Sequence, residues 1–498
     1  MVDAPLSRHA DPPGSPEAGL PPAVAAALVF LASGAVLVLE LLGLRLLGPY
    51  VGLTLETTTA IIGVTLAGIA AGAAAGGYAA DRTDPRRLLA GLLMGGGALA
   101  LLTVPIVREL GPDMPGGGEL AIVGVSALAL LPPAAVLSAV TPTVARLQLR
   151  EVRTSGTVFG RLSAWATAGA LAGTFATGFV LVPLLAVSTS VLATGAVLVL
   201  TGLCVGLRSG RTRRANAAAV AVFALAAGAL TLAAGTPCQA ESTYHCARVE
   251  ADPGHPGGRE LILEDISHSY VDLGNPGHLE FDYTRWIGDA IDAMAPAEEP
   301  LDAVFVGGGG FTLPRYLAAT RPGSRSRVLE VDGELVDLAR ERLGLRTSPD
   351  LRVTVGDARV ELRDEATASA DLVVGDAFGG RNVPWHLTTA EWVADVRRVL
   401  RPGGLYAVNV IDHQPLSLLK AEATTLLDAF ADVRLVAFPG PAGGNQVLLA
   451  SDRLLKPSVR STSRGARTLG QTAVERLTAG AEVLRDDDAP ADQLLSAP

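Results

Sequence analysis

Cysteines, aromatic side chains and basic charge are all scarce in this sequence. Three cysteines in 498 residues are too few for a disulfide-rich scaffold or a cysteine-based zinc site. Aromatic residues make up only 4% of the chain. Acidic residues outnumber basic ones, which gives a formal net charge of −10, and no basic stripe appears in the second half of the chain. We therefore expect no nucleic-acid partner.

The N-terminus also lacks the features of a secretory signal. Residues 1–20 are polar and rich in Pro and Gly, and no basic segment precedes the apolar run that begins at Pro22. A secretory signal needs a basic segment directly before its apolar run. We therefore predict that residues 1–21 form a disordered tail.

Apolar residues are distributed unevenly along the chain. They make up 49% of all residues, and the mean hydropathy is +0.37. Residues 22–235 consist largely of Ala, Leu, Val and Gly with few charges, whereas residues 240–498 have the composition of a soluble protein. This contrast is typical of an integral membrane protein with more than one domain. We predict a transmembrane domain over 22–235, a small β-rich segment with a helix over 240–295, and an α/β domain over 296–498.

The apolar half contains seven segments of the length that a membrane-spanning helix needs, about 20 residues. The fourth segment is interrupted by Pro132, Pro133 and Pro142, which neighbouring helices in a bundle tolerate. We therefore expect an all-α transmembrane bundle. Its predicted helices are 22–44, 57–80, 87–107, 119–145, 157–183, 187–207 and 215–235.

Small residues at helical spacing favour a packed bundle rather than separate anchors. Gly72 and Gly76 lie four residues apart in the second segment, and Gly169 and Gly173 do so in the fifth. Glycine at this spacing lets two helix backbones approach closely. A Gly- and Ala-rich composition also scatters such pairs by chance, so both interpretations stay open at this point.

Arginines lie in alternate loops between the predicted helices. The positive-inside rule assigns such loops to the cytoplasm, so the N-terminus is expected there too. Seven crossings would then place the second half of the chain on the far side of the membrane. The arginines follow the second, fourth and sixth segments, and they are Arg82, Arg86, Arg87, Arg146, Arg150, Arg153, Arg208, Arg211, Arg213 and Arg214.

From Leu301 onward, short apolar strands alternate with helical stretches. This rhythm predicts a mostly parallel sheet, preceded by a small β-rich segment over 241–280. Ligands of such sheets bind at the carboxyl ends of the strands. Helices are expected over 334–342 and 390–400. Strands are expected over 302–306, 327–331, 352–355, 371–375, 404–410, 432–438 and 445–450.

The first of these strands ends in a glycine run, Gly307 to Gly310. Glycine there lets the backbone approach a ligand without a side-chain clash. A dinucleotide-binding fingerprint needs a further glycine three positions after the second one, but Thr312 follows Gly307 and Gly309 at that position. The glycine run alone is therefore a weak signal and does not indicate NAD.

Acidic residues after the next three strands strengthen that signal. Glu330 and Asp332 come at the end of the second strand, at the distance expected for a carboxylate that binds ribose hydroxyls. Asp357 and Ala358 follow the third strand and suit an adenine amino group, and Asp376 follows the fourth. One such acid is usually a solvated loop residue, but the ordered series predicts an S-adenosyl-type site. We accordingly predict a Rossmann-like α/β fold of the class I methyltransferase type.

Several motifs resemble the spermidine synthase (polyamine aminopropyltransferase) family. They are VFVGGGGFTLPRY, VLEVD, GDA and VVGDAF in the α/β domain, with ESTYH (Glu241 to His245) and LEFDYTRWI (Leu279 to Ile287) upstream. The closing LRDDDAPADQLL and the first apolar segment, SGAVLVLELLGLRLL, are similar to family members that carry a membrane domain. The resemblance covers nearly the whole chain and is most specific between residues 301 and 410.

The resemblance implies an aminopropyltransferase of polyamine biosynthesis that uses decarboxylated S-adenosylmethionine as a co-substrate and has no prosthetic group. It implies that Asp376 is the catalytic carboxylate, with Tyr283 as a hydrogen-bonding partner. Glu330 would hold the ribose and Asp357 the adenine. The implied cofactor-binding residues are Gly307, Gly308, Gly309, Glu330, Asp332, Asp357 and Ala358.

The sequence departs from the family on the acceptor side of the site. Gly310 and Gly379 stand where the family usually has Asp. Thr284 and Arg285 follow Tyr283 where the family has His or Gln and then Glu. A diamine carries two positive charges and needs anionic partners when it loses water. Putrescine and a different amine therefore both stay open as acceptors.

Two other functions remain open. An S-adenosylmethionine-dependent methyltransferase would use the same fold and would need no paired carboxylates for its acceptor. A membrane protein that binds or transports a polyamine or nucleoside without turnover is the second alternative. The histidines show no metal-ligand spacing, so no metal is expected. The expected partners are a small-molecule amine and membrane lipid, and the sequence leaves a homodimer open.

The side of the membrane on which the second half lies also stays open. Cys238 and Cys246 come just after the seventh segment and could pair only in an oxidising compartment, which agrees with the far side. The nucleoside co-substrate, in contrast, is made in the cytoplasm. We expect a multi-pass protein of the cell membrane and leave the side of its soluble domain undecided.

Overall fold

The chain divides into two compact units, a helical one made mostly of residues before Gly235 and an α/β one made mostly of residues after it. Of the predicted tail, residues 1–19 lie outside the described residues. A computed structural model describes residues 20–51, 55–116, 118–149, 155–209, 214–296, 298–378, 383–440, 443–455 and 465–495.

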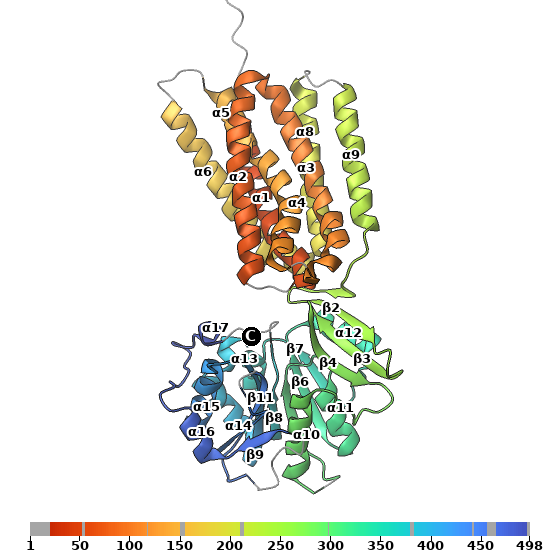
Figure 1. Ribbon diagram of the computed structural model, residues 1–498, viewed down its shortest axis with the longest axis vertical. Helices are drawn as coiled ribbons and strands as arrows, with labels where there is room; N and C mark the ends of the chain where they lie inside the picture. The colour runs from red at the N-terminus through yellow and green to blue at the C-terminus, as the bar shows by residue number, and fades with distance from the viewer. Residues whose placement is uncertain are drawn as a thin grey trace, which may run out of the picture. The chain divides into compact units, whose positions relative to one another are not determined.

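The helical unit is a bundle of long apolar helices (Figure 1). Among the described residues, six segments are long and apolar enough to cross a membrane, which supports six of the predicted spans by length and composition. The seventh, 215–235, stays a prediction because the described apolar helix there, Ala221–Ala233, is shorter. The helices are α1 (Pro22–Val51), α2 (Leu55–Arg82), α3 (Pro85–Leu110), α4 (Gly118–Ser138), α5 (Val140–Gln148), α6 (Ser155–Ala176), α7 (Val182–Leu184), α8 (Val187–Ser209) and α9 (Arg214–Ala233).

The two predicted glycine pairs lie at helix contacts. A Cβ atom at Gly72 in α2 would overlap the carbonyl oxygen of Ala135 in α4, and one at Gly76 would lie 2.5 Å from the Cβ of Ala139. The second pair, which begins at Gly169 in α6, packs in the same way against the backbone of α1. Both pairs therefore serve close helix packing, since any larger side chain would force the helices apart.

The α/β unit begins with a small antiparallel sheet and a helix. The sheet has the order β1-β2-β3-β4. The apolar face of the helix, α10 (Asp282–Met294), is spaced three and four residues apart through Tyr283, Trp286, Ile287 and Ala290, as expected for packing on a sheet. The strands are β1 (Ala240–Glu241), β2 (Cys246–Ala251), β3 (Gly258–Leu263) and β4 (Ile266–Asp272).

The main sheet is mixed and mostly parallel, with the order β12-β10-β11-β9-β8-β5-β6-β7. Neighbours from β9 to β7 run parallel, and the three pairings on the other side of β9 are antiparallel. The predicted sheet is confirmed, whereas the short β12 was not predicted. The strands are β5 (Asp302–Val306), β6 (Arg325–Glu330), β7 (Leu351–Val355), β8 (Ala370–Gly375), β9 (Leu400–Asp412), β10 (Asp432–Ala437), β11 (Gly444–Ser451) and β12 (Arg467–Leu469).

Helices cover both faces of the main sheet (Figure 1). Side chains alternate along each strand, so Phe305 and Ala407 pack under α10, α11 and α12, while Val306 and Tyr406 pack under α14, α15 and α16. The sheet therefore has one hydrophobic core on each face, and the alternation along a strand determines the face to which each of its residues points. The helices are α11 (Thr312–Thr320), α12 (Gly333–Arg342), α13 (Ala358–Glu361), α14 (Ala390–Val399), α15 (Ser417–Ala429), α16 (Gln471–Leu477) and α17 (Ala491–Leu494).

Candidate functional site

The ends of four neighbouring strands form the candidate site. Strands β8, β5, β6 and β7 are adjacent in that order and parallel, so their carboxyl ends share one edge of the sheet. Asp376, Gly307, Glu330 and Asp357 lie at or within two residues of those ends. Gly307 has a φ of +93°, and a Cβ there would overlap the carbonyl oxygen of Asp376, so the close approach of the β5 and β8 ends requires glycine.

The glycine loop holds the carboxylate of Glu330. The amide of Gly308 donates to Oε2 of Glu330 at 2.6 Å, and the amide of Gly309 donates to the same oxygen at 3.4 Å. The amide of Asp332 donates to Oε1 at 2.9 Å. Burial raises the pKa of Glu330, and these hydrogen bonds oppose the shift. The carboxylate is thus fixed at the end of β6, where the ribose of a bound nucleoside is expected.

Asp332 caps a helix in this structure. Its Oδ1 accepts from the amides of Glu334 and Leu335 at 3.1 and 3.3 Å, at the start of α12. Its Oδ2 accepts from the hydroxyl of Ser242 at 2.6 Å. Both oxygens therefore have partners within the protein, which favours a role in fixing α12 and the β1–β2 loop beside Glu330. Direct contact between Asp332 and a nucleoside stays a prediction.

Asp357 lies beyond the end of β7, the last of the four neighbouring strands, and its side chain is accessible to solvent. Its Oδ1 accepts from the amide of Arg359 at 2.8 Å and thereby caps α13, whose first residue is the buried Ala358. The side chain of Asp357 is 47% exposed, so the carboxylate remains accessible to an adenine amino group. Nε2 of His386, which sequence analysis did not assign to the site, lies 3.4 Å from Oδ1.

Asp376 lies between a tyrosine and an asparagine. Its Oδ1 accepts from Nδ2 of Asn409 at 3.0 Å, and the hydroxyl of Tyr283 also hydrogen-bonds its carboxylate. Burial raises the pKa of Asp376 to about 6, against the effect of both hydrogen bonds. Burial and the charge of Asp376 raise the pKa of Tyr283 well above its ordinary value, so this phenol stays a donor. A carboxylate with a pKa close to neutrality is suited to accept a proton.

Asn409 was not predicted as a site residue. The register between β8 and β9 pairs Gly375 with Val408, and its continuation places Asn409 beside Asp376. Oδ1 of Asn409 is buried and has no hydrogen-bond partner among the described residues. Buried polar atoms are nearly always paired, so this oxygen is a natural acceptor for a substrate N–H. The available signal was one polar residue within the apolar strand LYAVNVI.

At the acceptor-side positions where this sequence differs from the family, the residues present supply no second carboxylate. The amide of Gly310 donates to Oγ of Ser269 at 3.0 Å, and a Cβ at this glycine would lie 2.8 Å from the Cβ of Ser269. Strand β4 therefore occupies the space of a larger side chain. The hydroxyl of Thr284 donates to the carbonyl oxygen three residues before it at 2.7 Å, and Arg285 is exposed. Gly379 lies outside the described residues.

Sequence comparison finds relatives among the aminopropyltransferases. The chain is 33% identical over 277 residues to polyamine aminopropyltransferase 2 of Streptomyces coelicolor, which covers 51% of this chain and 50% of that protein. It is 27% identical over 154 residues to the polyamine aminopropyltransferase of Vibrio vulnificus, which covers 30% of this chain and 50% of that protein. The chain thus spans about half the length of these two relatives. No protein-family model matches the chain.

One solved structure is similar over almost its whole length. It is a probable spermidine synthase from Corynebacterium glutamicum, with 31% identity over 49% of this chain and 94% of that chain, and a TM-score of 0.46. The α/β unit has a methyltransferase-like fold, as predicted. On these sequence identities, the C-terminal half of the chain belongs to the spermidine synthase (polyamine aminopropyltransferase) family.

Proposed function

We propose that the α/β unit is an aminopropyltransferase that moves the aminopropyl group of decarboxylated S-adenosylmethionine to an amine. The observation that carries the proposal is the state of Asp376, a carboxylate with a pKa of about 6 that Tyr283 and Asn409 hold by hydrogen bonds. It lies on the same sheet edge as Glu330 and Asp357. This arrangement puts a proton acceptor beside the predicted nucleoside site.

The chemistry explains why a carboxylate is needed there. The lone pair of the amine nitrogen attacks the propyl carbon that is bonded to the sulfonium sulfur. The carbon–sulfur bond breaks, its electron pair goes to sulfur, and neutral methylthioadenosine leaves. The amine must shed a proton, which Asp376 accepts, while Oδ1 of Asn409 accepts a second N–H and orients the nitrogen. Holding the two reactants in line supplies much of the remaining acceleration.

The acceptor side favours an amine with one positive charge near the reacting nitrogen. Among the described residues, no second acid contributes to the pKa of Asp376, and the segment that follows, 379–382, contains no acidic residue. A second ammonium group would lose water here without gaining an anionic partner. We therefore propose a monoamine, or an amine with a widely separated second charge, in preference to a compact diamine.

The same observation favours a methyltransferase as the second candidate. A methyl acceptor needs one proton acceptor and no paired carboxylates, and Asp376 with Asn409 would provide that too. In that reaction S-adenosylhomocysteine leaves instead of methylthioadenosine. The leaving product therefore separates the two functions.

The test uses the full-length protein in detergent. It is incubated with decarboxylated or intact S-adenosylmethionine and a panel of monoamines and diamines, and the products are identified by mass spectrometry. Methylthioadenosine that forms only with an amine supports aminopropyl transfer, whereas S-adenosylhomocysteine supports the second candidate. If neither product forms but the nucleoside still binds, both proposed activities are contradicted, and the protein binds the nucleoside without turnover. Asp376→Asn should lose the product, and Glu422→Gln, a buried acid on α15, should retain it.

We also propose that the helical unit is embedded in the cell membrane. Its support is the six segments of crossing length and the glycine-mediated contacts between their helices. Extraction of membranes with alkaline carbonate should leave the protein in the pellet, because that treatment releases only peripheral proteins. Recovery in the supernatant would contradict the proposal.

A further inference from the structure

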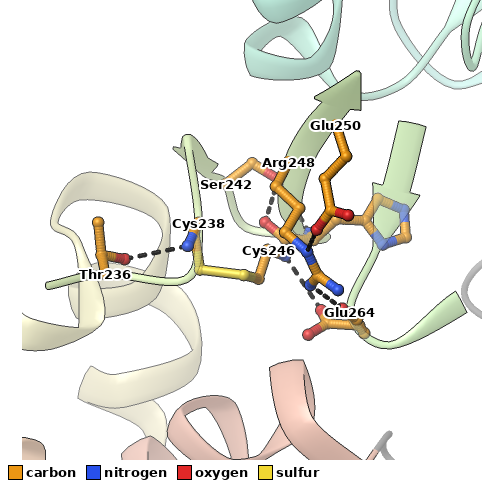
Figure 2. The surroundings of a disulfide bond; sticks show 8 residues. Thr236, Cys238, Ser242, Cys246, Arg248, Glu250 and Glu264 are labelled. Atoms are coloured by element: carbon orange, nitrogen blue, oxygen red, sulfur yellow. Dashed lines mark hydrogen bonds and ion pairs between the residues drawn. A yellow bond between two sulfur atoms is a disulfide. The ribbon is translucent and has the colours of Figure 1, made fainter. Parts of the chain in front are cut away.

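A disulfide closes the loop between β1 and β2. Cys238 and Cys246 are bonded, with a Cα–Cα distance of 5.1 Å (Figure 2). The pairing of Glu241 with Cys246 also closes the loop. Cys246 is also anchored from the other side, since its amide donates to Oε1 of Glu264 at 3.1 Å. The pairing of the bonded cysteines was open from the sequence alone. The bond makes a small ring of the ESTYH motif, which the proposed reaction has not used.

The tip of this ring reaches the end of β6. The hydroxyl of Ser242 donates to Oδ2 of Asp332 at 2.6 Å and accepts from the amides of Tyr244 and His245, both at 3.0 Å. Asp332 in turn donates its amide to Oε1 of Glu330 at 2.9 Å. The backbone of Tyr244 is thus connected to the Glu330 carboxylate through a short chain of hydrogen bonds. Strand β1 also packs against α12, which Asp332 caps.

The phenol of Tyr244 is near enough to the carboxylates of the predicted nucleoside site for their charges to act on it. Burial and the charges of Asp332, Asp357 and Glu330, in that order, raise the pKa of its phenol. Those acids come from the ends of β6 and β7, and the backbone of Tyr244 is held at the end of β6 through Ser242 and Asp332, so the loop lies on the ribose and adenine side of the predicted site. The residue is 46% exposed, which leaves part of the ring accessible to a ligand. The protonated phenol offers both an aromatic face and an O–H donor.

We infer that Tyr244 forms a wall of the nucleoside site and that the Cys238–Cys246 disulfide positions it there. The inference rests on the proposed nucleoside site and adds to it a binding residue and a covalent support. An aromatic side chain stacks on the π-face of a base and does not need the hydrogen-bonding edge of that base. Tyr244 could therefore contact the base while the neighbouring carboxylates bind the ribose and the amino group.

The disulfide adds a covalent tie to a loop that is otherwise held by hydrogen bonds and by one short strand. Strand β1 has two residues and pairs only with β2, at the edge of the small sheet. So short an edge strand contributes few hydrogen bonds. Reduction would leave Ser242 and Tyr244 on a flexible loop, and binding would then have to order them. An affinity that depends on the redox state of the cysteines follows from this geometry.

The test measures binding of methylthioadenosine to the full-length protein in detergent by calorimetry. Tyr244→Ala should weaken binding by roughly 5- to 100-fold, the range of a lost base–aromatic contact, while Tyr244→Phe should stay within about threefold. The double variant Cys238→Ser, Cys246→Ser and the reduced wild type should both weaken binding by about fivefold or more, because the loop must then be ordered on binding. Reoxidation of the wild type should restore its affinity.

Two controls separate a site residue from a structural one. Tyr270→Phe removes a 2.8 Å hydrogen bond to Asp252 in the same small sheet and should leave the affinity within about twofold. The apparent KM for the amine should also stay unchanged in Tyr244→Ala, since the amine binds at Asp376. Thermal unfolding shows whether each variant is folded.

The outcomes distinguish this inference from the proposed function. If the wild type binds the nucleoside and forms product, but Tyr244→Ala and the double cysteine variant bind as tightly, the inference is wrong and the proposed function stands. Equal weakening of nucleoside affinity and amine KM by Tyr244→Ala would likewise overturn it, because that pattern indicates a general loss of structure. A wild type that binds no nucleoside would overturn both.

Discussion

The raised pKa of Asp376 predicts that the proposed catalytic acid destabilises the protein at neutral pH. Burial moves this pKa from 3.8 to about 6. Each pKa unit corresponds to about 1.4 kcal/mol, so the ionised carboxylate costs the folded state about 3 kcal/mol relative to the unfolded chain. Because the folded state holds the proton more tightly, the cost is absent below pH 4, grows between pH 4 and 6, and is complete above pH 6.

Asp376→Asn should therefore gain stability with rising pH relative to the wild type. An amide does not titrate in this range, so the difference between the two proteins isolates the Asp376 charge. Asparagine offers Tyr283 and Asn409 one acceptor oxygen instead of two. The weakened hydrogen bonding should cost the variant about 1 kcal/mol of stability at every pH, which offsets part of the gain. We expect a difference near zero or slightly unfavourable at pH 4 and a net gain of about 2 kcal/mol at pH 8.

The assay is thermal unfolding of the full-length protein in detergent, followed by tryptophan fluorescence from pH 4 to pH 8. Three of the four tryptophans, Trp286, Trp385 and Trp392, lie in the α/β unit. For a unit of this size, 2 kcal/mol corresponds to a rise in Tm of roughly 4–8 °C. A difference between variant and wild type that does not change with pH would refute the reasoning, because it would show that the carboxylate is not titrating under burial.

Glu422 provides a matched control for this prediction. It is buried in α15, and burial, followed by the charge of Asp412, raises its pKa to about 8. Its folded pKa is also above the ordinary value, so its destabilising effect grows from about pH 4.5 and is complete above pH 8. Relative to the wild type, Glu422→Gln should gain stability progressively from about pH 4.5 to pH 8, with turnover retained. The gain in stability of Asp376→Asn should instead be complete by about pH 6, and this variant should lose turnover.

Three further predictions concern other parts of the molecule. Asp357→Ala should weaken nucleoside binding at least tenfold by calorimetry, since its carboxylate is exposed to the site; wild-type affinity would remove it from the site. Gly72→Ala should cost about 1–3 kcal/mol and lower Tm by several degrees, because α4 occupies the space, whereas Gly63→Ala in the same helix meets nothing within 4 Å and should be tolerated. In intact cells that carry a Cys204→Ser variant, which removes the free cysteine, Cys238 and Cys246 should react with a maleimide only after reduction, and labelling without reductant would contradict the disulfide.

The fold was largely predictable because local patterns and topology agree. Strand β5 was predicted with its observed bounds, since a run of four apolar residues after Asp302 ends at the glycine loop. Strand β9 was predicted as 404–410 but extends over Leu400–Asp412, because Leu400 pairs with Ala370 at one end and Asp412 with Gly444 at the other. Strand β12 has three residues and pairs only with β10, so its formation depends on a tertiary contact rather than on a sequence pattern.

The two sides of the site differ in how far the sequence could predict them. Glu330, Asp357 and Asp376 follow parallel strands directly, so the order of the strands alone brings them to one edge. Asn409 lies within β9, and only the register between β8 and β9 places it against Asp376. Tyr244 comes from the separate small sheet and reaches the site through a loop contact. Register and loop docking are tertiary properties that a single sequence does not encode locally.

One helix connects the cysteine chemistry with the side of the membrane on which the site lies. The positive-inside rule predicts a cytoplasmic N-terminus. On that prediction, six crossings would leave the α/β unit in the cytoplasm, and a seventh, by α9, would put it on the far side. A disulfide persists on the far side and is reduced in the cytoplasm. If α9 crosses, the loop that carries Tyr244 is locked and the co-substrate must be supplied outside the cytoplasm. If α9 does not cross, the co-substrate is available in the same compartment. The cysteines are then reduced, and we expect the site to bind the co-substrate weakly. On the proposals above, whether α9 crosses the membrane would therefore determine both the supply of the nucleoside and the affinity of the site for it.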